Sequence, residues 1–461
     1  MEIKHIDYFK NLLGSENVYD DKAHLIAYCY DATRTRYEPD AVLFPRDESD
    51  VSEILKYCNE HRIIITPRGA GSGFTGGALP ANGGIILAFE KHMNKILEID
   101  MENMVAVVQP GVINMHLQRT VEAQGLFYPP DPASEEYSTL GGNVSENAGG
   151  MRAAKYGITK DYVMALRAVL PSGEIIRAGK RTIKDVAGYN IAGILIASEG
   201  TLACITEITL KLIAKPKMSQ TAMGIFPSVE DAMNAVYKTM AAGVTPVAME
   251  FLDNLSINAV EQKFNKGLPK DAGAILITDV DGNTGDELTQ QLDIIEHAFL
   301  ENGCSGFKRA GSLEESKNLW FARRNASQSI TIYGSKKLNE DITVPRSKLP
   351  ALLKAIGEVS KKYNVTVPCF GHTGDGNVHT NVMVDGSDPK QLEIGHAAIE
   401  EIFKATVALG GTLSGEHGIG LIQKEYIDIA FDEVQLQLMR GIKKVFDPNN
   451  ILNSGKIFDP S

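Results

Sequence analysis

The chain has 461 residues, and its 46 lysines and arginines against 58 aspartates and glutamates give it a formal net charge of −12. An acidic chain without a long basic run argues against nucleic acid as a partner, because phosphate binding over an extended surface requires a positive patch. The hydrophobic content of 43% is typical of a soluble globular protein, and the length predicts two or three domains.

The opening stretch MEIKHIDYFKNLLGSENVY lacks the apolar core and cleavage site of a signal peptide. No window reaches the roughly 18 apolar residues of a membrane-spanning helix, so we expect a cytoplasmic protein without a transmembrane segment. The 5 cysteines form no CxxC pair, which predicts neither a disulfide framework nor an iron–sulfur cluster. Electrons that leave this protein would therefore pass to another molecule.

The first half of the chain predicts an α+β domain, because short helices interrupt a mostly antiparallel strand pattern. In chain order we expect a helix Asp50–His61 with Asp50 as its N-cap, strands Ile63–Thr66, Gly84–Phe89, Lys95–Asp100 and Val105–Gln109, a helix Asn114–Gln124, a hairpin across Leu166–Gly179 and a strand Ala203–Ile213.

The pattern changes to longer units at Lys215–Met218, which is the expected domain boundary. Strands that alternate with long helices predict one α/β sandwich whose sheet is covered on one face. We expect helices at Glu230–Gly243, Asp286–Gly303, Leu349–Tyr363 and Pro389–Leu409, and strands at Ala274–Val280 and Val365–Phe370.

A glycine-rich loop follows the strand Ile63–Thr66. Gly71, Gly73 and Gly76 match the spacing GxGxxG, but the continuation GGALPANGG cannot begin the helix that a Rossmann dinucleotide site requires. Arg68 and the glycines instead predict a backbone nest for a phosphate, with a mobile surface loop as the alternative. A second glycine- and asparagine-rich stretch at 138–157 favours a large phosphorylated ligand.

Several motifs together resemble a known family. PRGAGSGFTGGA, PPDPAS, STLGGNVSENAGG, KYG and ASEGTLACITEITLKL are similar to the flavin-binding domain of vanillyl-alcohol oxidase type flavoproteins. With GHTGDGNVH, SGEHGIG and FDPNNILNSGK they resemble the FAD-linked D-2-hydroxyacid dehydrogenases, the branch that holds D-lactate dehydrogenases, the glycolate oxidase D subunit and D-2-hydroxyglutarate dehydrogenase.

The resemblance implies an α+β fold with two domains. Residues 1–215 would form an FAD-binding domain of two α+β subdomains. Residues 216–461 would form an α/β-sandwich, ferredoxin-like substrate domain, whose tail from about 446 to 461 returns to the FAD domain.

The resemblance also implies the residues that line the cofactor. No histidine or cysteine occurs between Thr66 and Phe89, so we expect FAD bound without a covalent link. The implied FAD residues are Pro67, Arg68, Gly69, Ala70, Gly71, Ser72, Gly73, Pro130, Asp131, Ser138, Thr139, Gly142, Asn143, Asn147, Ala148, Gly150, Tyr156, Gly157, Glu199, Gly200, Ile205 and Asn453.

The stretch VPCFGHTGDGNVHTNVMV predicts a hairpin in which a six-residue connection, Thr373–Val378, puts His372 opposite His379. Alternation along the strand then sends His379, Asn381 and Met383 to one face. Two imidazoles with the carboxylate of Glu416 are ligands that a divalent transition metal favours, although histidines that only hydrogen-bond within a hairpin remain the alternative. Asp375 is expected to shape the turn as an Asx residue.

The resemblance assigns these residues roles. His372, His379 and Glu416 align with ligands of a divalent metal (Zn, Mn or Fe), and His417 aligns with the catalytic base. A substrate carboxylate needs a cation, which Arg323 or Arg324 can supply; the family register favours Arg323, with Ser327 and Asn381 as further substrate contacts. Hydroxyglutarate enzymes carry a lysine where Asn339 is expected here, which favours a small monocarboxylate, although Lys336 and Lys337 lie close by.

The sequence therefore predicts an FAD- and divalent-metal-dependent dehydrogenase that oxidises D-lactate or glycolate to the 2-oxo acid, with hydride passing to flavin N5. Alternatives are a D-2-hydroxyglutarate or D-malate dehydrogenase, a non-catalytic flavoprotein subunit, and a flavin-free metal enzyme. Electrons would pass to a separate acceptor: an iron–sulfur subunit, an electron-transfer flavoprotein or a quinone. A homodimer and peripheral attachment to the inner face of the membrane through a partner are further expectations.

Overall fold

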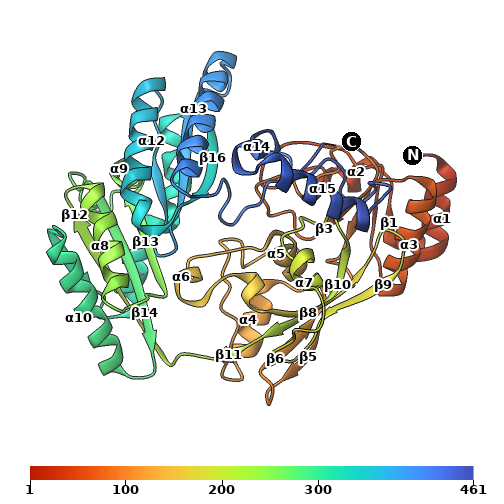
Figure 1. Cartoon of the computed structure of the whole chain (residues 1–461), viewed down its shortest axis with the longest axis horizontal. Coiled ribbons are helices and arrows are strands. Elements are labelled where there is room, and N and C mark those ends of the chain that lie inside the picture. Colours follow the sequence, from red (N-terminus) through yellow and green to blue (C-terminus); the bar gives the residue numbers. More distant parts are fainter. Residues whose placement is uncertain (460–461) are drawn as a thin grey trace. The chain divides into compact units, whose positions relative to one another are not determined.

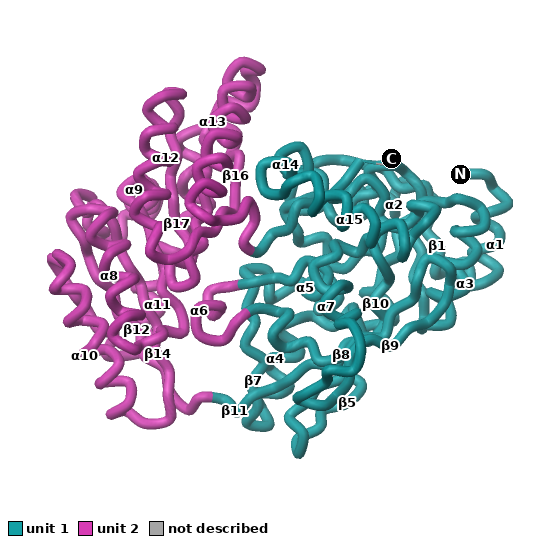
Figure 2. Tube along the Cα trace, in the orientation of Figure 1, with its two compact units in different colours: residues 1–149, 158–215, 416–461 teal, residues 150–157, 216–415 magenta. Residues whose placement is uncertain are grey.

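The computed structural model describes residues 1–459 (Figure 1). The chain divides into two compact units (Figure 2). Unit 1 holds residues 1–149, 158–215 and 416–461, and unit 2 holds residues 150–157 and 216–415. Within the described residues, no helix is both long and apolar enough to cross a membrane. The last two residues of the predicted C-terminal tail lie outside the described residues.

Unit 1 contains a four-stranded sheet in the order β1-β2-β4-β3, in which β4 pairs in parallel with β2 and with β3. The elements are strands β1 Val18–Tyr19, β2 Ala41–Leu43, β3 Ile65–Arg68 and β4 Ile85–Ala88, with helices α1 Ile3–Leu13, α2 Lys22–Leu25 and α3 Glu48–His61. Apolar side chains of α1 and α3 pack on this sheet in a core that includes Phe9, Ile54 and Leu87.

The N-cap expected for the helix at 50–61 is wrong. Helix α3 begins at Glu48, and its cap is Asp47, whose carboxylate accepts the N–H groups of Ser49 and Asp50. Asp50 lies in the first turn of the helix and pairs with Arg46 instead. Both aspartates precede the apolar face, and the one that meets the free N–H groups becomes the cap.

A second sheet of unit 1 is antiparallel, in the order β5-β6-β10-β8-β9. The predicted hairpin is confirmed as β8 paired with β9, and the predicted strand at 203–213 is observed as β10 at its centre. The remaining elements of unit 1 are β5 Ile96–Asp100, β6 Val105–Val108, β7 Leu126–Phe127, β8 Val163–Val169, β9 Ile175–Gly179, β10 Cys204–Lys211 and β11 Ile213–Ala214, with helices α4 Asn114–Glu122, α5 Leu140–Glu146, α7 Ile191–Leu195, α14 Ile427–Ala430 and α15 Glu433–Phe446.

Unit 2 is built on a seven-stranded antiparallel sheet in the order β15-β12-β14-β13-β17-β18-β16. Its strands are β12 Met218–Phe226, β13 Ala248–Asp253, β14 Ala274–Gly282, β15 Gly306–Arg309, β16 Lys336–Thr343, β17 Cys369–His372 and β18 Asn377–Val384. Its helices are α6 Ala153–Tyr156, α8 Val229–Ala241, α9 Asn254–Phe264, α10 Gly285–Glu301, α11 Leu313–Ser329, α12 Leu349–Tyr363 and α13 Pro389–Ala408.

Helices cover both faces of this sheet, so the expectation of one covered face is wrong. Helices α8, α10, α12 and α13 pack together over one face. Helices α9 and α11 pack on the other, where Trp320 and Ala326 of α11 share a core with Leu252 and Ile275 of the sheet. Every residue of β18 is buried, as expected for a strand that is covered on both sides. The overall α+β architecture expected from the sequence is confirmed.

The predicted hairpin around the histidines exists, but its register differs from the expected one. Strands β17 and β18 are joined by residues 373–376, and His379 lies opposite Phe370 instead of His372. The expected strand Val365–Phe370 also starts later, at Cys369. The expected Asx turn is confirmed, because the carboxylate of Asp375 accepts the N–H of Asn377 at 3.2 Å. This bond makes the connection shorter than expected, so the second strand begins at Asn377 and not after Val378.

Candidate functional site

The glycine-rich loops of unit 1 form a cavity of about 230 Å³. The loop 67–74 forms one wall, and the start and body of α5 form another. Ala203, Cys204 and Ile205 of the β10 region also line the cavity, as do Glu416 and His417. A ligand in this cavity would meet backbone on several sides.

Close packing of the loop explains two of its glycines. A Cβ on Gly69 would lie 2.1 Å from Thr139 Oγ1, and Gly71 has φ +67°, where a side chain would strike the guanidinium of Arg68. The guanidinium is buried behind the loop, donating to the carbonyl of Tyr30 at 2.8 Å and to that of Ala78 at 3.2 Å. Arg68 thus braces the loop backbone as well as lining the cavity.

Three polar atoms in the cavity wall are buried without a hydrogen-bond partner among the described residues. They are Ser138 Oγ, Asn143 Nδ2 and Glu146 Oε2. Buried polar atoms in proteins are almost always paired, so a hydroxyl, an amide and a carboxyl in one wall fit a large polar ligand. The cavity therefore fits the expected FAD.

The structure gathers fifteen of the residues implied for FAD around this cavity and places seven elsewhere. Those that line it are Pro67, Arg68, Gly69, Ala70, Gly71, Ser72, Gly73, Ser138, Thr139, Gly142, Asn143, Ala148, Glu199, Gly200 and Ile205. Those outside the lining are Pro130, Asp131, Asn147, Gly150, Tyr156, Gly157 and Asn453.

Several of the outlying residues have other contacts. The Asn453 amide donates to the carbonyls of Gly77 and Glu199, which supports the cavity wall from behind. Tyr156 belongs to unit 2 and donates its hydroxyl to Asp281 at 2.6 Å. Asn147 accepts the N–H of Lys160.

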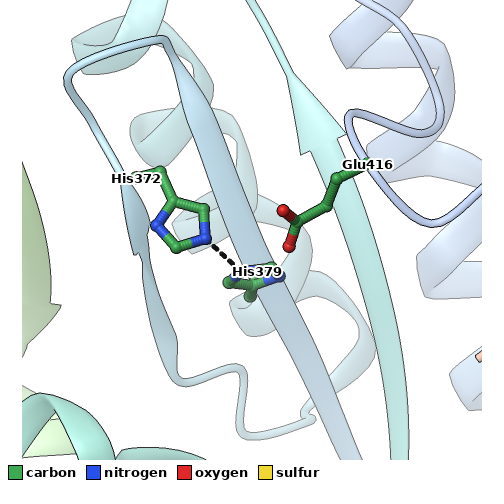
Figure 3. Close-up of side chains that lie close together, drawn as sticks. All are labelled: His372, His379 and Glu416. Atoms are coloured by element: carbon green, nitrogen blue, oxygen red, sulfur yellow. Dashed lines mark hydrogen bonds between the residues drawn. The ribbon is translucent and has the colours of Figure 1, made fainter. Parts of the chain in front are cut away.

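His372, His379 and Glu416 form a group in which one ligand atom of each residue lies within 4.8 Å of the others (Figure 3). The Nε2 atoms of the two imidazoles are 3.4 Å apart, and the rings meet edge to face. Two imidazole nitrogens and a carboxylate oxygen that converge in this way are a suitable donor set for a divalent transition metal.

A buried carboxylate lies beside each imidazole. Glu250 on β13 lies directly opposite His372 on β17, and its carboxylate accepts from His372 Nδ1 at 2.5 Å. A proton on Nδ1 leaves the lone pair of Nε2 free for a metal. Asp341 on β16 lies opposite His379, with its Oδ1 4.0 Å from Nδ1.

The carboxyl of Glu250 is fully buried, yet its pKa is lowered. Burial raises this pKa, but the charges and hydrogen bonds of His372 and Arg323 outweigh burial. Arg323 Nε donates to Glu250 at 2.5 Å, and the guanidinium carbon lies 5.0 Å from the centre of the Phe370 ring. One buried carboxylate therefore holds a histidine and an arginine together on the α11 face of the sheet.

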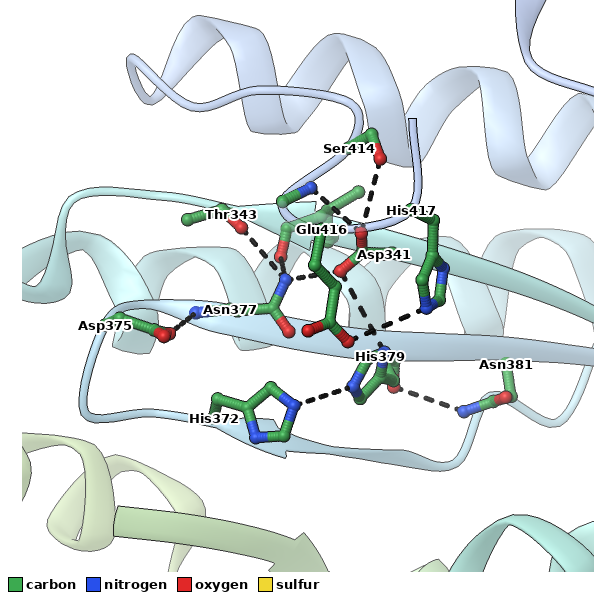
Figure 4. Close-up of polar contacts among 12 residues, drawn as sticks. Asp341, Thr343, His372, Asp375, Asn377, His379, Asn381, Ser414, Glu416 and His417 are labelled. Carbon is green, nitrogen blue, oxygen red and sulfur yellow. Dashed lines mark hydrogen bonds and ion pairs between the residues drawn. The ribbon is translucent and has the colours of Figure 1, made fainter. Parts of the chain in front are cut away.

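The loop after β18 and α13 brings Glu416 into the group. The N–H of Gly415 donates to Asp341, and the hydroxyl of Ser414 donates to the same carboxylate at 3.3 Å (Figure 4). A Cβ on Gly415 would lie 2.2 Å from Thr343 Oγ1, so this close approach requires glycine.

His417 follows Glu416 and is mostly buried. Its Nε2 lies 3.6 Å from Glu416 Oε1, and its ring lies 5.2 Å from that of Phe74 in the glycine-rich loop. Gly418 has φ +91°, which lets the chain turn sharply directly after this imidazole.

The three residues expected to bind substrate all lie in unit 2. Asn381 is buried, and its amide donates to the carbonyls of Pro368 and His379, both at 3.2 Å. Ser327 lies one turn after Arg323 on α11, and its hydroxyl accepts from Lys337 Nζ at 2.8 Å. Asn339 lies opposite Asn381 on the neighbouring strand, so Lys337, two residues earlier, shares that face.

Sequence reasoning missed Glu250, Asp341 and Glu146. Glu250 carries an acid into an otherwise apolar stretch, VAMEFL. An acid at such a position is rarely buried unless it is paired, and this signal could have identified Glu250. Asp341 lies in the polar strand KKLNEDIT, which gives no such signal. Their partners could not have been named, because Glu250 lies 122 residues before His372 in the chain.

Comparison with known proteins gives a consistent result. Residues 39–179 match the FAD binding domain family, and residues 215–457 match the C-terminal domain of FAD linked oxidases. The chain is 41% identical to the glycolate oxidase subunit GlcD of Bacillus subtilis, over 96% of this chain and 94% of that protein. It is 36% identical to a D-lactate dehydrogenase of Anaerostipes hadrus, over 97% and 94% of the two chains.

The fold also matches a solved structure. p-Cresol methylhydroxylase superposes on this chain with a TM-score of 0.81 at 19% identity, over 99% of this chain and 97% of that one. An identity this low carries the fold alone. The match confirms the vanillyl-alcohol oxidase type architecture that the sequence motifs predict.

Proposed function

The chain belongs to the FAD-linked oxidases and is an FAD-dependent dehydrogenase, and we propose that it oxidises a small D-2-hydroxy acid, D-lactate or glycolate, to the 2-oxo acid with the help of a divalent metal. The observation that carries the proposal is the convergence of His372, His379 and Glu416, with the carboxylate of Glu250 2.5 Å from Nδ1 of His372.

FAD, when bound, supplies the acceptor for the hydride that leaves the α-carbon. A divalent cation on the two imidazoles and the carboxylate would supply a Lewis acid that lowers the pKa of the substrate hydroxyl. Zinc, manganese and iron all suit such a donor set.

His417 is proposed as the base that receives the hydroxyl proton. The imidazole is 3.6 Å from the carboxylate of Glu416, so the base and a metal ligand are adjacent in space as well as in sequence.

Arg323 is proposed to bind the carboxylate of the substrate. Its Nε is committed to Glu250, and this contact fixes the plane of the guanidinium. The two terminal nitrogens then present a fork of the kind that matches a carboxylate. Ser327 and Asn381 are proposed as further contacts.

A dicarboxylate such as D-malate or D-2-hydroxyglutarate is the second candidate, because Lys337 donates to Ser327 at the position proposed for substrate. The ammonium could pair with a distal carboxylate of the substrate. Replacement of Lys337 by methionine would raise KM for the dicarboxylate and leave that for lactate unchanged if a dicarboxylate is the substrate.

The electron acceptor is proposed to be a separate molecule: an iron–sulfur protein, an electron-transfer flavoprotein or a quinone. The relative from Bacillus subtilis is named as a subunit, which supports an acceptor in another chain. Within such an assembly the present chain would reduce its flavin with substrate.

Anaerobic stopped-flow absorbance tests the proposal. The metal-analysed protein is mixed with glycolate and with each enantiomer of lactate, malate and 2-hydroxyglutarate, and bleaching of the flavin is followed. We expect D-lactate or glycolate to bleach it fastest. Bleaching by none of the four acids would contradict the proposal, and bleaching of metal-depleted protein at the full rate would contradict the metal.

A further inference from the structure

A pair of glutamates in unit 1 takes no part in the proposed reaction. Glu146, at the end of α5, and Glu199, before β10, both line the cavity. A Cβ on Gly418 would lie 2.6 Å from Glu146 Oε2 and 3.0 Å from Glu199 Oε1. The two carboxyl groups therefore approach the same point, directly beside the peptide that follows His417.

The surroundings of the two carboxyls are unequal. The two oxygens of Glu199 accept the N–H groups of Ile419 and Gly420, both at 2.7 Å. Such bonds from neutral donors to a carboxylate favour its charged form. Glu146 Oε2 is buried and has no hydrogen-bond partner in the described part of the chain.

Two buried carboxyls this close do not both ionise readily. Burial and the charge of Glu199 raise the pKa of Glu146 well above its ordinary value, and Asp31 adds to this, while Lys456 opposes it. Burial also raises the pKa of Glu199, against its two N–H donors and Lys456. The two N–H donors favour the negative charge on Glu199, and the raised pKa of Glu146, which has no such donors at Oε2, favours the proton there.

We propose that Glu146 is a neutral carboxylic acid that donates a hydrogen bond from the cavity wall to the bound flavin and thereby raises its reduction potential. Glu199 carries the negative charge of the pair, and its hydrogen bonds to Ile419 and Gly420 hold the loop that carries His417 in place. Reduction adds negative charge to the flavin, and a neutral donor stabilises that charge, whereas an ionised carboxylate would repel it. The inference rests on FAD in this cavity and not on the identity of the substrate or the metal.

Other charged groups around the pair bear on its pH dependence. Asp31 and Lys456 act on Glu146 directly, and Arg68, Glu416 and His417 line the same cavity. A titration assigned to Glu146 must therefore disappear in a variant that removes only this carboxyl. Glu146→Gln does so, because the amide keeps the shape and a donor but cannot ionise.

The test is a redox titration of the FAD-loaded protein with dithionite and a reference dye, from pH 6 to 9, together with infrared difference spectra of flavin reduction. Glu146→Ala should shift the equilibrium constant of flavin reduction about 10- to 100-fold toward the oxidised form, the range for losing one hydrogen bond to a charged group. Glu146→Gln should keep most of the wild-type potential and lose the infrared band of a protonated carboxyl. Glu122→Gln, on the surface of unit 1, is the matched control and should change neither.

Two results would overturn the proposal: a wild-type potential in Glu146→Ala, or a protonated-carboxyl band that persists in Glu146→Gln. If neither variant loads FAD, the wild type decides alone, because a difference spectrum without a protonated-carboxyl band contradicts a neutral Glu146. Dithionite needs no hydroxy acid, so failure here is distinct from failure of the proposed function, which is read from bleaching by substrate.

Discussion

Replacement of Glu250 by glutamine tests the link between the metal group and the substrate arginine. The carboxylate of Glu250 is fully buried and binds His372 Nδ1 and Arg323 Nε, each at 2.5 Å. Glutamine keeps the size and loses the charge. Its single side-chain oxygen can serve only one of the two donors, and its amide would face the other.

The expected cost follows from these contacts. A hydrogen bond to a charged group contributes about 1.5–3 kcal/mol, and loss of a partner that orients a metal-binding histidine typically costs about 10- to 100-fold in metal affinity. We therefore expect Glu250→Gln to weaken metal binding by about 10- to 100-fold. It should also raise KM for the hydroxy acid, because the guanidinium of Arg323 is no longer fixed.

The assay is a competition titration with a chelator of known affinity, followed by steady-state kinetics at saturating metal. FAD content serves as the internal control, since Glu250 lies in unit 2 and the cavity lies in unit 1. Glu301→Gln, an exposed change on α10, is the matched variant. Metal affinity and KM that both equal those of the wild type would refute the reasoning.

His417→Ala should retain FAD and slow flavin reduction by about two to four orders of magnitude, the usual range for a general base; stopped-flow rates within threefold of the wild type would exclude that role. His379→Ala should lose the metal, as measured by elemental analysis, and full occupancy with normal turnover would refute the ligand. Gly418→Ala should weaken FAD binding, because the new Cβ meets the carboxyls of Glu146 and Glu199 at 3.0 Å or less; fluorescence titration with FAD measures the loss. Because burial raises the pKa of both carboxyls above 4.5, the folded protein binds their proton more tightly than the unfolded chain, so their contribution to stability is complete below pH 4.5 and is lost as the pH rises. Unfolding curves in urea should show a shallower loss for Glu146→Gln, and an unchanged slope would contradict the raised pKa.

Local patterns in the sequence predicted much of the fold. The helix expected at Leu349–Tyr363 has the observed bounds, because its apolar spacing is regular and Asn364 in left-handed conformation ends it. The hairpin of β8 and β9 was predicted because its turn, PSGE, carries the glycine that a positive φ requires. Both features depend only on residues that are close together in the sequence.

Part of the site was predicted. The residues that were missed depend on contacts between segments that are far apart in the sequence. The proximity of His372 and His379 came from one hairpin, and it survives a register error because residues two apart on a strand share a face. Glu250 and Asp341 reach the same face from strands whose order in the sheet follows no local signal. The pairing of Glu146 with Glu199 likewise depends on how α5 and the loop before β10 pack.

Anomalous diffraction from crystals soaked in zinc or manganese tests the central claim most directly. The account predicts one strong peak within about 2.0–2.3 Å of His372 Nε2, a ring nitrogen of His379 and a carboxylate oxygen of Glu416, absent in His379→Ala. A peak elsewhere on the chain, or none at these three residues at saturating metal, would contradict it.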